Sequence, residues 1–358
     1  MKLNTTQILE RIVQVNASDL HLCVGSSPYI RVNTKLSALS DMPVLTVDDI
    51  EYFLSQILTE EQKALFEVNK ELDFSISLGA KNRFRVNAFY QRGYPSVALR
   101  LIPMTIPSLA QLNLPTMLSD LCQLKQGLVL VAGPTGHGKS TTIAAMIDKI
   151  NETRAEHIVT IEDPIEYIYT NKMSLIEQRE MYLDTHSWEG ALKGALRQDP
   201  NIVMIGEMRD LETMSSALQI SETGHLVFAT LHTNSASQTV ERIISSFPEP
   251  SQGQVRLQLA QVLEVIISQR LIASPTKGMV PAVEIMLASD AIKNLIREGR
   301  THLIDTTIST SLNVGMTSLE RSLADLASQG VIDATDAILY SNHPDEFRRL
   351  VKDFKFKK

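Results

Sequence analysis

The N-terminal hundred residues alternate between helix-like and strand-like spacing of apolar positions. Residues 5–15 place apolar side chains on one helical face. Residues 46–58 and 59–69 each open with a threonine and acidic residues, which is typical of a capped helix start. Strict alternation predicts strands in the segments DLHLCVG, PYIRVN, LDFSISLG, NRFRVNAFYQRG and PSVALRLIP. We therefore predict a small mixed α/β domain over residues 1–103.

A different pattern follows a proline-rich stretch. The segment PMTIPSLAQLNLP carries three prolines in thirteen residues, so residues 104–122 are predicted to be a linker. Nearly continuous apolar runs then alternate with helical segments, namely GLVLVAG, HIVTIED, NIVMIGE and HLVFATLH. Such runs are typical of a parallel sheet covered by helices on both faces. We predict an α/β core over residues 123–275.

The last hundred residues are predicted to be mostly helical. Helical spacing is expected from PSQGQVRLQLAQVLEVIISQRLI onward, with VPAVEIML as the exception, a predicted strand. Residues 276–358 are therefore predicted to form a mainly helical C-terminal part. The fold class that results is α/β.

Composition narrows the class of protein. The chain has 358 residues, of which 44% are hydrophobic and 21% charged, with a net charge of −7. No basic stripe marks it as a nucleic-acid binder. Its two cysteines, Cys23 and Cys122, form no metal-binding or disulfide pattern. The N-terminal segment lacks a signal-peptide core, and no apolar run approaches the ~20 residues of a membrane span. We expect a cytoplasmic protein without membrane insertion.

The segment GPTGHGKS fits the phosphate-binding pattern G-x-x-x-x-G-K-[ST] at every fixed position. It follows a predicted strand and precedes a predicted helix, as the motif requires. Its glycines let backbone N–H groups converge, and the helix N-terminus favours phosphate there. The residues predicted to bind ATP are Gly133, Pro134, Thr135, Gly136, His137, Gly138, Lys139, Ser140 and Thr141. Lys139 is expected to reach the β- and γ-phosphates, and the Ser140 hydroxyl is expected to bind Mg²⁺.

His137 occupies a free position of this loop, where a small serine or alanine is the default. An imidazole is bulkier and titrates near neutral pH. We favour a side chain that points outward from the loop.

Two acidic positions follow predicted strands. NIVMIGE ends in Glu207, at the carboxyl end of a strand where open α/β sheets bind ligands, so Glu207 is predicted to orient the attacking water. Many phosphate-loop enzymes have an aspartate where this chain has Gly206, so Mg²⁺ is expected to depend on Ser140, phosphates and water. HIVTIED ends in Glu162, which is predicted to help hold a Mg²⁺-bound water; a solvated loop is the alternative.

Histidines and arginines supply further candidates. His232 falls at the carboxyl end of a predicted strand and is predicted to donate a hydrogen bond to the γ-phosphate, whereas His225 lies at the other end. The first domain carries arginines that either form an exposed basic strand pair or reach ATP across a boundary. A well-placed arginine finger is worth roughly 10³–10⁵ in rate. These arginines are Arg83, Arg85, Arg92 and Arg100.

Together these motifs resemble the secretion-ATPase superfamily, and most closely the type IV pilus retraction (twitching motility) ATPases of the PilT type. SDLHL with PYIRVN resembles the start of the family's PAS-like N-terminal domain. GPTGHGKSTT is similar to its Walker A motif, TIEDPIEY to its Asp box, IGEMRD to its atypical Walker B motif and TGHLVFATLHTNSA to its His box. ISQRL, after the His box, is also similar. The resemblance implies a RecA-like ATPase core and makes the missing Walker B aspartate normal.

Within this superfamily, the resemblance favours the retraction branch. Assembly and type II secretion ATPases are longer and commonly carry a four-cysteine element that this chain lacks. Residues 291–299, AIKNLIREG, are similar to the AIRNLIRE signature of retraction ATPases, with Lys293 in place of arginine. The accessory retraction ATPase paralogue stays open as an alternative, as does an assembly or type II secretion ATPase.

The resemblance also implies partners and a mechanism. It implies a homohexamer whose ATP site is closed by Arg85, Arg92 or Arg100 of the first domain. It further implies ATP hydrolysis that moves an inner-membrane pilus platform protein, so that pilin leaves the fibre base. Two alternatives of other classes remain: a nucleic-acid translocase, which the acidic balance argues against, and a scaffold that binds ATP without hydrolysing it.

Overall fold

The computed structural model describes residues 4–32, 35–79, 82–102, 105–275 and 278–355. The chain divides into two compact units, Met1–Thr105 with Glu166–Ile168 and Ile106–Ile165 with Tyr169–Lys358. Residues 103–104, where the first predicted boundary falls, and residues 276–277, after the second, lie outside the described residues. No described helix is both long and apolar enough to span a bilayer.

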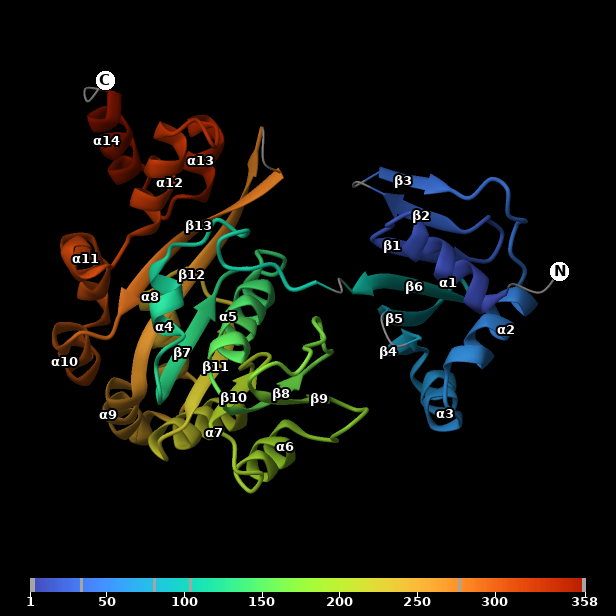
Figure 1. The fold of residues 1–358 in the computed structure, drawn as a ribbon, viewed down its shortest axis with the longest axis horizontal. Coiled ribbons are helices and arrows are strands. Elements are labelled where there is room, and N and C mark those ends of the chain that lie inside the picture. The colour runs from blue at the N-terminus through green and yellow to red at the C-terminus, as the bar shows by residue number, and fades with distance from the viewer. Residues whose placement is uncertain (1–3, 33–34, 80–81, 103–104, 276–277, 356–358) are drawn as a thin grey trace. The chain divides into compact units, whose positions relative to one another are not determined.

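The first unit is a six-stranded antiparallel sheet with helices over one face (Figure 1). The strand order is β3-β2-β1-β6-β5-β4. Alternation along the strands turns apolar residues toward the helices and polar ones to the other face. Its elements are α1 (Thr5–Gln14), β1 (Asp19–Cys23), β2 (Tyr29–Val32), β3 (Lys35–Ala38), α2 (Val47–Ile57), α3 (Glu60–Asn69), β4 (Glu71–Leu78), β5 (Asn82–Gln91) and β6 (Tyr94–Ile102).

The helices of this unit begin where the sequence predicts. Thr46 and Thr59 each form a capping box, in which the threonine hydroxyl accepts from the third backbone N–H and that residue's side chain accepts in return. Phe53 of α2 and Ile12 of α1 are fully buried in one core with Phe84 of β5. The predicted mixed α/β character of residues 1–103 is confirmed over the described residues.

The second unit contains a seven-stranded sheet in the order β13-β12-β7-β11-β10-β8-β9. All neighbours pair in parallel except β13, which is antiparallel to β12. Its elements are α4 (Met117–Leu121), β7 (Gly127–Ala132), α5 (Lys139–Thr153), β8 (His157–Glu162), β9 (Leu175–Glu180), α6 (Trp188–Ala195), β10 (Ile202–Ile205), α7 (Leu211–Glu222), β11 (Leu226–Leu231), α8 (Ala236–Ser245), α9 (Gln252–Val262), β12 (Leu263–Ser274), β13 (Gly278–Leu287), α10 (Asp290–Glu298), α11 (Ile304–Thr310), α12 (Leu319–Ser328), α13 (Ala334–Tyr340) and α14 (Pro344–Lys355), with single 3₁₀ turns at Glu249–Ser251, Thr301–Leu303 and Leu312–Val314.

The centre of this sheet is covered on both faces. Every residue of β7, β10 and β11 is buried, which is why their sequences are continuously apolar rather than alternating. Because β7, β11, β10 and β8 run in parallel, their carboxyl ends meet at one edge. The predicted parallel-sheet core is confirmed, and this edge is where the candidate site lies.

Two segments differ from the sequence prediction. The stretch predicted to continue as helix after residue 250 is helical only to Val262; Leu263–Ser274 is strand β12, which pairs with β7. Its valine and isoleucines favour a strand once both sides are paired. Residues 106–122, predicted as a linker, lie within the second unit and include helix α4, with Leu109, Leu114 and Leu118 buried.

Helices α12, α13 and α14 form a separate small core on the β12–β13 hairpin (Figure 1). Ile272, Val280 and Ala282 of the hairpin pack with Leu319 and Leu323 of α12. The predicted strand VPAVEIML is confirmed as part of β13, and α10 to α14 confirm the helical character predicted for the rest. This packing places α13 beside the strand that borders the phosphate loop.

Candidate functional site at the carboxyl edge of the parallel sheet

The loop between β7 and α5 has the shape that its sequence predicts. β7 ends at Ala132 and α5 begins at Lys139, with Gly138 in a left-handed conformation at the helix N-terminus. A Cβ on Gly136 would meet no described atom of another residue within 4 Å, apart from its chain neighbours. The loop leads directly into the N-terminus of α5, an arrangement suited to a phosphate group. The residues present fit a nucleotide.

Lys139 is folded back on this loop. It is buried, with 7% of its surface exposed, and its Nζ donates to the carbonyl oxygens of Gly133 at 2.9 Å and Pro134 at 3.0 Å. The same nitrogen lies 3.5 Å from Nδ1 of His232. Backbone carbonyl oxygens of the loop thus hold the ammonium of Lys139, and phosphate oxygens are able to replace them.

His232 connects the loop to Glu207. Its Nδ1 lies 3.2 Å from the Thr135 hydroxyl, and its Nε2 lies 3.1 Å from Oε1 of Glu207. Lys139 can only donate, so its approach to Nδ1 assigns the ring proton to Nε2, which then donates to the carboxylate. The second oxygen of Glu207 accepts from Nε of Arg209 at 2.8 Å. The pKa of Arg209 is raised, chiefly by its hydrogen bond to Glu207.

The close approach of strand β8 explains why position 206 is a glycine and not an aspartate. A Cβ there would lie 3.2 Å from both the Cα of Glu162 and the carbonyl oxygen of Ile161. The backbone N–H of Gly206 also donates to that carbonyl at 2.8 Å. Because β8 approaches so closely, a side chain at 206 would have to push backbone aside, and the carboxylate is carried one residue later, by Glu207.

Glu162 lies on the adjacent strand end, where the sequence places it. It is 5% exposed, and its Oε1 accepts from the Thr160 hydroxyl at 2.7 Å and from Nε2 of Gln178 at 3.1 Å. It is therefore a buried, hydrogen-bonded carboxylate and not part of a solvated loop. His225 lies at the opposite end of β11, where its Nδ1 contacts the Thr223 hydroxyl and the carbonyl of Ile220.

The side chain of His137 lies against the neighbouring strand β12 and helix α13. Its Nδ1 accepts from the backbone N–H of Leu271 on β12 at 2.9 Å, and its ring meets Tyr340 of α13 edge-on with centroids 6.4 Å apart. Burial, Arg270 and Lys139 lower the pKa of His137, which favours the neutral ring that this hydrogen bond requires. The contacts come from residues far along the chain, which the loop sequence does not reveal.

The predicted arginines belong to the first unit. Arg85 and Arg100 stand directly opposite each other on β5 and β6, and Arg92 occupies the β5–β6 turn with a φ of 51°. Arg100 donates to Asp19 at 2.9 Å, and Arg31 lies 3.4 Å from the same carboxylate. Burial alone raises the pKa of Asp19, but hydrogen bonds from Ser18 and Arg100 hold it below its ordinary value. Arg85 and Arg100 form the exposed basic strand pair that the alternation predicts, whereas Arg83 is half-buried and donates to the Ser75 hydroxyl. Whether any of these arginines reaches ATP stays a prediction.

The segment ISQRL resembles the family pattern, but the sequence alone predicts no role for its Gln269 and Arg270, which lie on β12. Gln269 is 2% exposed and bonds both the phosphate loop and α5. Arg270 is 6% exposed and donates from Nη2 to the backbone oxygen of Asn234 at 2.9 Å, in the loop after His232. The available signal was three consecutive polar residues, Ser-Gln-Arg, within an otherwise apolar run.

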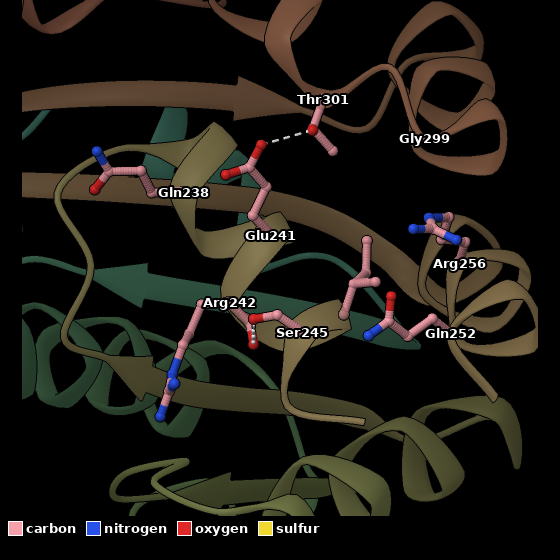
Figure 2. A pocket seen from close by; sticks show the side chains of 9 residues that line it. Gln238, Glu241, Arg242, Ser245, Gln252, Arg256, Gly299 and Thr301 are labelled. Carbon is pink, nitrogen blue, oxygen red and sulfur yellow. Dashed lines mark hydrogen bonds between the residues drawn. The ribbon is translucent and has the colours of Figure 1, made fainter. Parts of the chain in front are cut away.

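A surface pocket of about 510 Å³ lies elsewhere in the second unit, between α8, α9 and the end of α10 (Figure 2). In it, Glu241 points to Thr301, whose hydroxyl donates at 2.8 Å, while Arg242 and Arg256 come from different helices. None of the predicted site residues lines this pocket. The candidate site is therefore the sheet edge and not the pocket.

Comparisons with known proteins identify the family of this chain. A family model described as "Type II/IV secretion system protein" matches residues 1–329. The chain belongs to the type II/IV secretion system protein family. It is 41% identical over 96% of its length to the whole of the Pseudomonas aeruginosa type IV pilus retraction ATPase PilT. It is 40% identical over 97% of its length to 91% of the type IV pilus ATPase PilU of the same organism.

A solved structure of this family has the same fold. The crystal structure of the pilus retraction motor PilT with bound ADP is 43% identical to this chain, covers 97% of it and superposes with a TM-score of 0.91. The resemblance to PilT-type ATPases predicted from the motifs is thereby confirmed, and so is the α/β fold class. Within the type II/IV secretion system family, the chain is PilT-like.

Proposed function

We propose that this chain is a Mg²⁺-dependent ATPase that powers type IV pilus retraction and twitching motility. The observation that carries the proposal is the match to the whole of PilT, together with a phosphate loop whose Lys139 is connected through His232 to Glu207. The relative with bound ADP supports a nucleotide as the ligand of this loop. The working form is a homohexamer at the cytoplasmic face of the inner membrane, engaged with the pilus platform protein.

In the proposed site, each residue has a separate task. Lys139 leaves the carbonyls of Gly133 and Pro134 to bind the β- and γ-phosphates, and Ser140 holds Mg²⁺, which neutralises developing charge when bound. Glu207 orients the attacking water, and His232 donates to the γ-phosphate. Glu162 holds a metal-bound water.

Arginines of the first unit complete the proposed site from a neighbouring part of the ring. Arg85 and Arg100 face each other across β5 and β6, and the carboxylate of Asp19 balances the charge of Arg100. Like charges opposite each other on a sheet are destabilising, and a bound anion between them relieves that repulsion. Arg85, Arg92 and Arg100 are therefore the candidates to close over the phosphates of ATP.

The first test replaces the ammonium. Lys139→Ala is expected to lower ATP turnover and ADP affinity by about 10²–10³-fold, because a preorganised charge in a dry site is lost. Turnover is measured by phosphate release with and without Mg²⁺. Lys193→Ala, which removes an exposed lysine paired with Glu189, is the matched control and retains activity. Full activity of Lys139→Ala would refute the site.

A second candidate function is that of an accessory retraction ATPase paralogue, because the chain is almost equally similar, at 40% identity, to a second type IV pilus ATPase, PilU. Deletion of the gene separates the two. Loss of twitching with surface pili retained supports the main retraction motor, whereas twitching that persists at reduced force supports the accessory role. Cells without pili would instead indicate an assembly motor.

A further inference from the structure

The phosphate loop rests on one buried side chain of a strand distant in sequence. Gln269 of β12 lies next to the end of β7, since Ser268 pairs with Ala132 in parallel register. Its Nε2 donates to the carbonyl oxygen of His137 at 2.8 Å, and its Oε1 accepts from the Thr142 hydroxyl of α5 at 2.8 Å. One amide therefore joins the last turn of the loop to the first turn of the helix.

The orientation of this amide is fixed by its partners. The carbonyl of His137 can only accept, so the nitrogen of Gln269 must face it, and the oxygen then faces Thr142. Both Gln269 and Thr142 are almost fully buried, at 2% and 1% exposure. A flipped amide would set two acceptors against each other where no water competes, so the arrangement has a single stable form.

The backbone of Gln269 sets the loop as well. A Cβ on Gly133 would lie 2.5 Å from the carbonyl oxygen of Gln269, and a Cβ on Gly138 would lie 2.9 Å from its Nε2. Both glycines have positive φ values, 147° and 80°. The two glycines that the motif fixes, Gly133 and Gly138, thus lie where β12 approaches the loop. Gln269 is in close contact with the loop at both its start and its end.

We propose that Gln269 is a positioning residue for nucleotide binding, whose buried amide holds the phosphate loop in its nucleotide-receiving curvature before nucleotide arrives. This inference rests on the proposed function, since it assumes that the loop binds a nucleotide. Gln269 does not touch the phosphates; it acts through the carbonyl of His137 and the hydroxyl of Thr142. A loop that is already ordered lowers the free-energy cost of binding nucleotide. This contribution is the same for bound ATP and for the transition state.

The test replaces the amide nitrogen by oxygen. Gln269→Glu keeps the volume and the acceptor for Thr142 but sets a carboxylate oxygen against the His137 carbonyl. Loss of one buried hydrogen bond predicts about a tenfold rise in the Kd for a fluorescent ADP analogue and in KM for ATP. The kcat is expected to stay within about twofold, because the lost contribution is common to ground and transition states.

A pH series distinguishes positioning from general loss of structure. When the carboxyl introduced by Gln269→Glu is protonated, it can donate to the His137 carbonyl, so the ratio of variant to wild-type KM is expected to fall as pH decreases from 8 to 6. Hydrogen exchange of nucleotide-free protein supplies a second readout, with amides of residues 135–139 exchanging faster in the variant at pH 8. Gln219→Glu makes the same chemical change on an exposed position of α7 and is the matched control.

A second variant guards against misfolding of the first. Thr142→Val removes the hydroxyl that orients the amide but leaves the donor to His137, so it is expected to raise KM about threefold with kcat unchanged. Unchanged KM, ADP affinity and loop exchange in both variants would overturn the inference while the ATPase proposal stands. A pH-independent loss of kcat at normal ADP affinity would also overturn it. A wild-type chain that binds no ADP would instead refute the proposed function.

Discussion

The two strands that flank β7 hold the phosphate loop in different ways. On the β11 side, the side chain of His232, which is 38% exposed, contacts the loop at Thr135. It also contacts Glu207, which follows β10 and is 20% exposed, and Glu207 pairs with Arg209, which is 62% exposed. On the β12 side, Gln269 and Arg270 are 2% and 6% exposed. On the accessible side, Glu207 pairs with Arg209 and accepts a hydrogen bond from His232, whereas on the buried side the amide of Gln269 donates directly to the loop. We therefore expect substitutions on the β11 side to change the rate of hydrolysis and substitutions on the β12 side to change the shape of the loop.

The largest effect is expected on the β11 side. Glu207→Gln keeps an acceptor for the Nε2–H of His232 but loses the charge that pairs with Arg209 and that we propose to orient the attacking water. We expect kcat for ATP hydrolysis to fall about 10²–10⁴-fold, the usual worth of a positioned base, while ADP affinity changes little. Steady-state phosphate release and ADP titration measure the two quantities.

Glu212→Gln, an exposed change in the first turn of α7, is the control for the lost negative charge. A Glu207→Gln enzyme with kcat within about fivefold of wild type would remove the catalytic assignment from this flank. It would leave His232 and Lys139 as the groups to test next.

How much of this site the sequence predicts depends on how local each contact is. The loop from Gly133 to Ser140 is a contiguous motif, and Glu207, Glu162 and His232 end strands whose carboxyl ends meet in any parallel sheet. These positions follow from apolar runs and spacing alone. The capped helices of the first unit are equally local and equally well predicted.

The β12 side could not be predicted in the same way. β12 lies beside β7 although more than a hundred residues separate them, and its apolar spacing also fits a helix. Without that pairing, Gln269 is one of three polar residues in an otherwise apolar run, and the sequence indicates no partner for His137. Leu271 and Tyr340 reach His137 only through tertiary packing.

A smaller effect, on stability alone, is expected from the strand paired with β12. Burial raises the pKa of Glu284 to about 7, although its carboxyl accepts from the backbone N–H of Ala236. The pKa of this carboxyl is higher in the folded protein than in the unfolded chain. The folded protein therefore loses stability as the pH rises from the unfolded pKa of about 4.5 to the folded pKa of about 7. Glu284→Gln keeps the acceptor without the charge, so the variant is expected to gain about 1–3 kcal/mol at pH 8.

Thermal unfolding at pH 5 and pH 8 measures this gain, which is expected to shrink at pH 5, where the wild-type carboxyl is protonated in the folded state. Glu249→Gln changes an exposed glutamate and is the control. The same gain at both pH values would show that the charge of Glu284 is not its cause.

The smallest effect on stability is expected at His137, the loop residue whose ring accepts a hydrogen bond from β12. Burial, Arg270 and Lys139 lower its pKa, so the folded state favours the neutral ring that accepts from Leu271. The stability that this ring contributes is complete above the unfolded pKa, about 6.5, and is lost as pH falls toward the folded value. In His137→Ser this pH-dependent part is absent, so the melting temperatures of the two proteins are expected to converge by about 2 °C between pH 7.5 and pH 5.5. His302→Ser, at an exposed position of the same unit, controls for removal of a histidine. Parallel melting curves across this pH range would show that the ring's bond to β12 does not depend on its protonation, and the coupling between the buried flank and the loop would then rest on Gln269 alone.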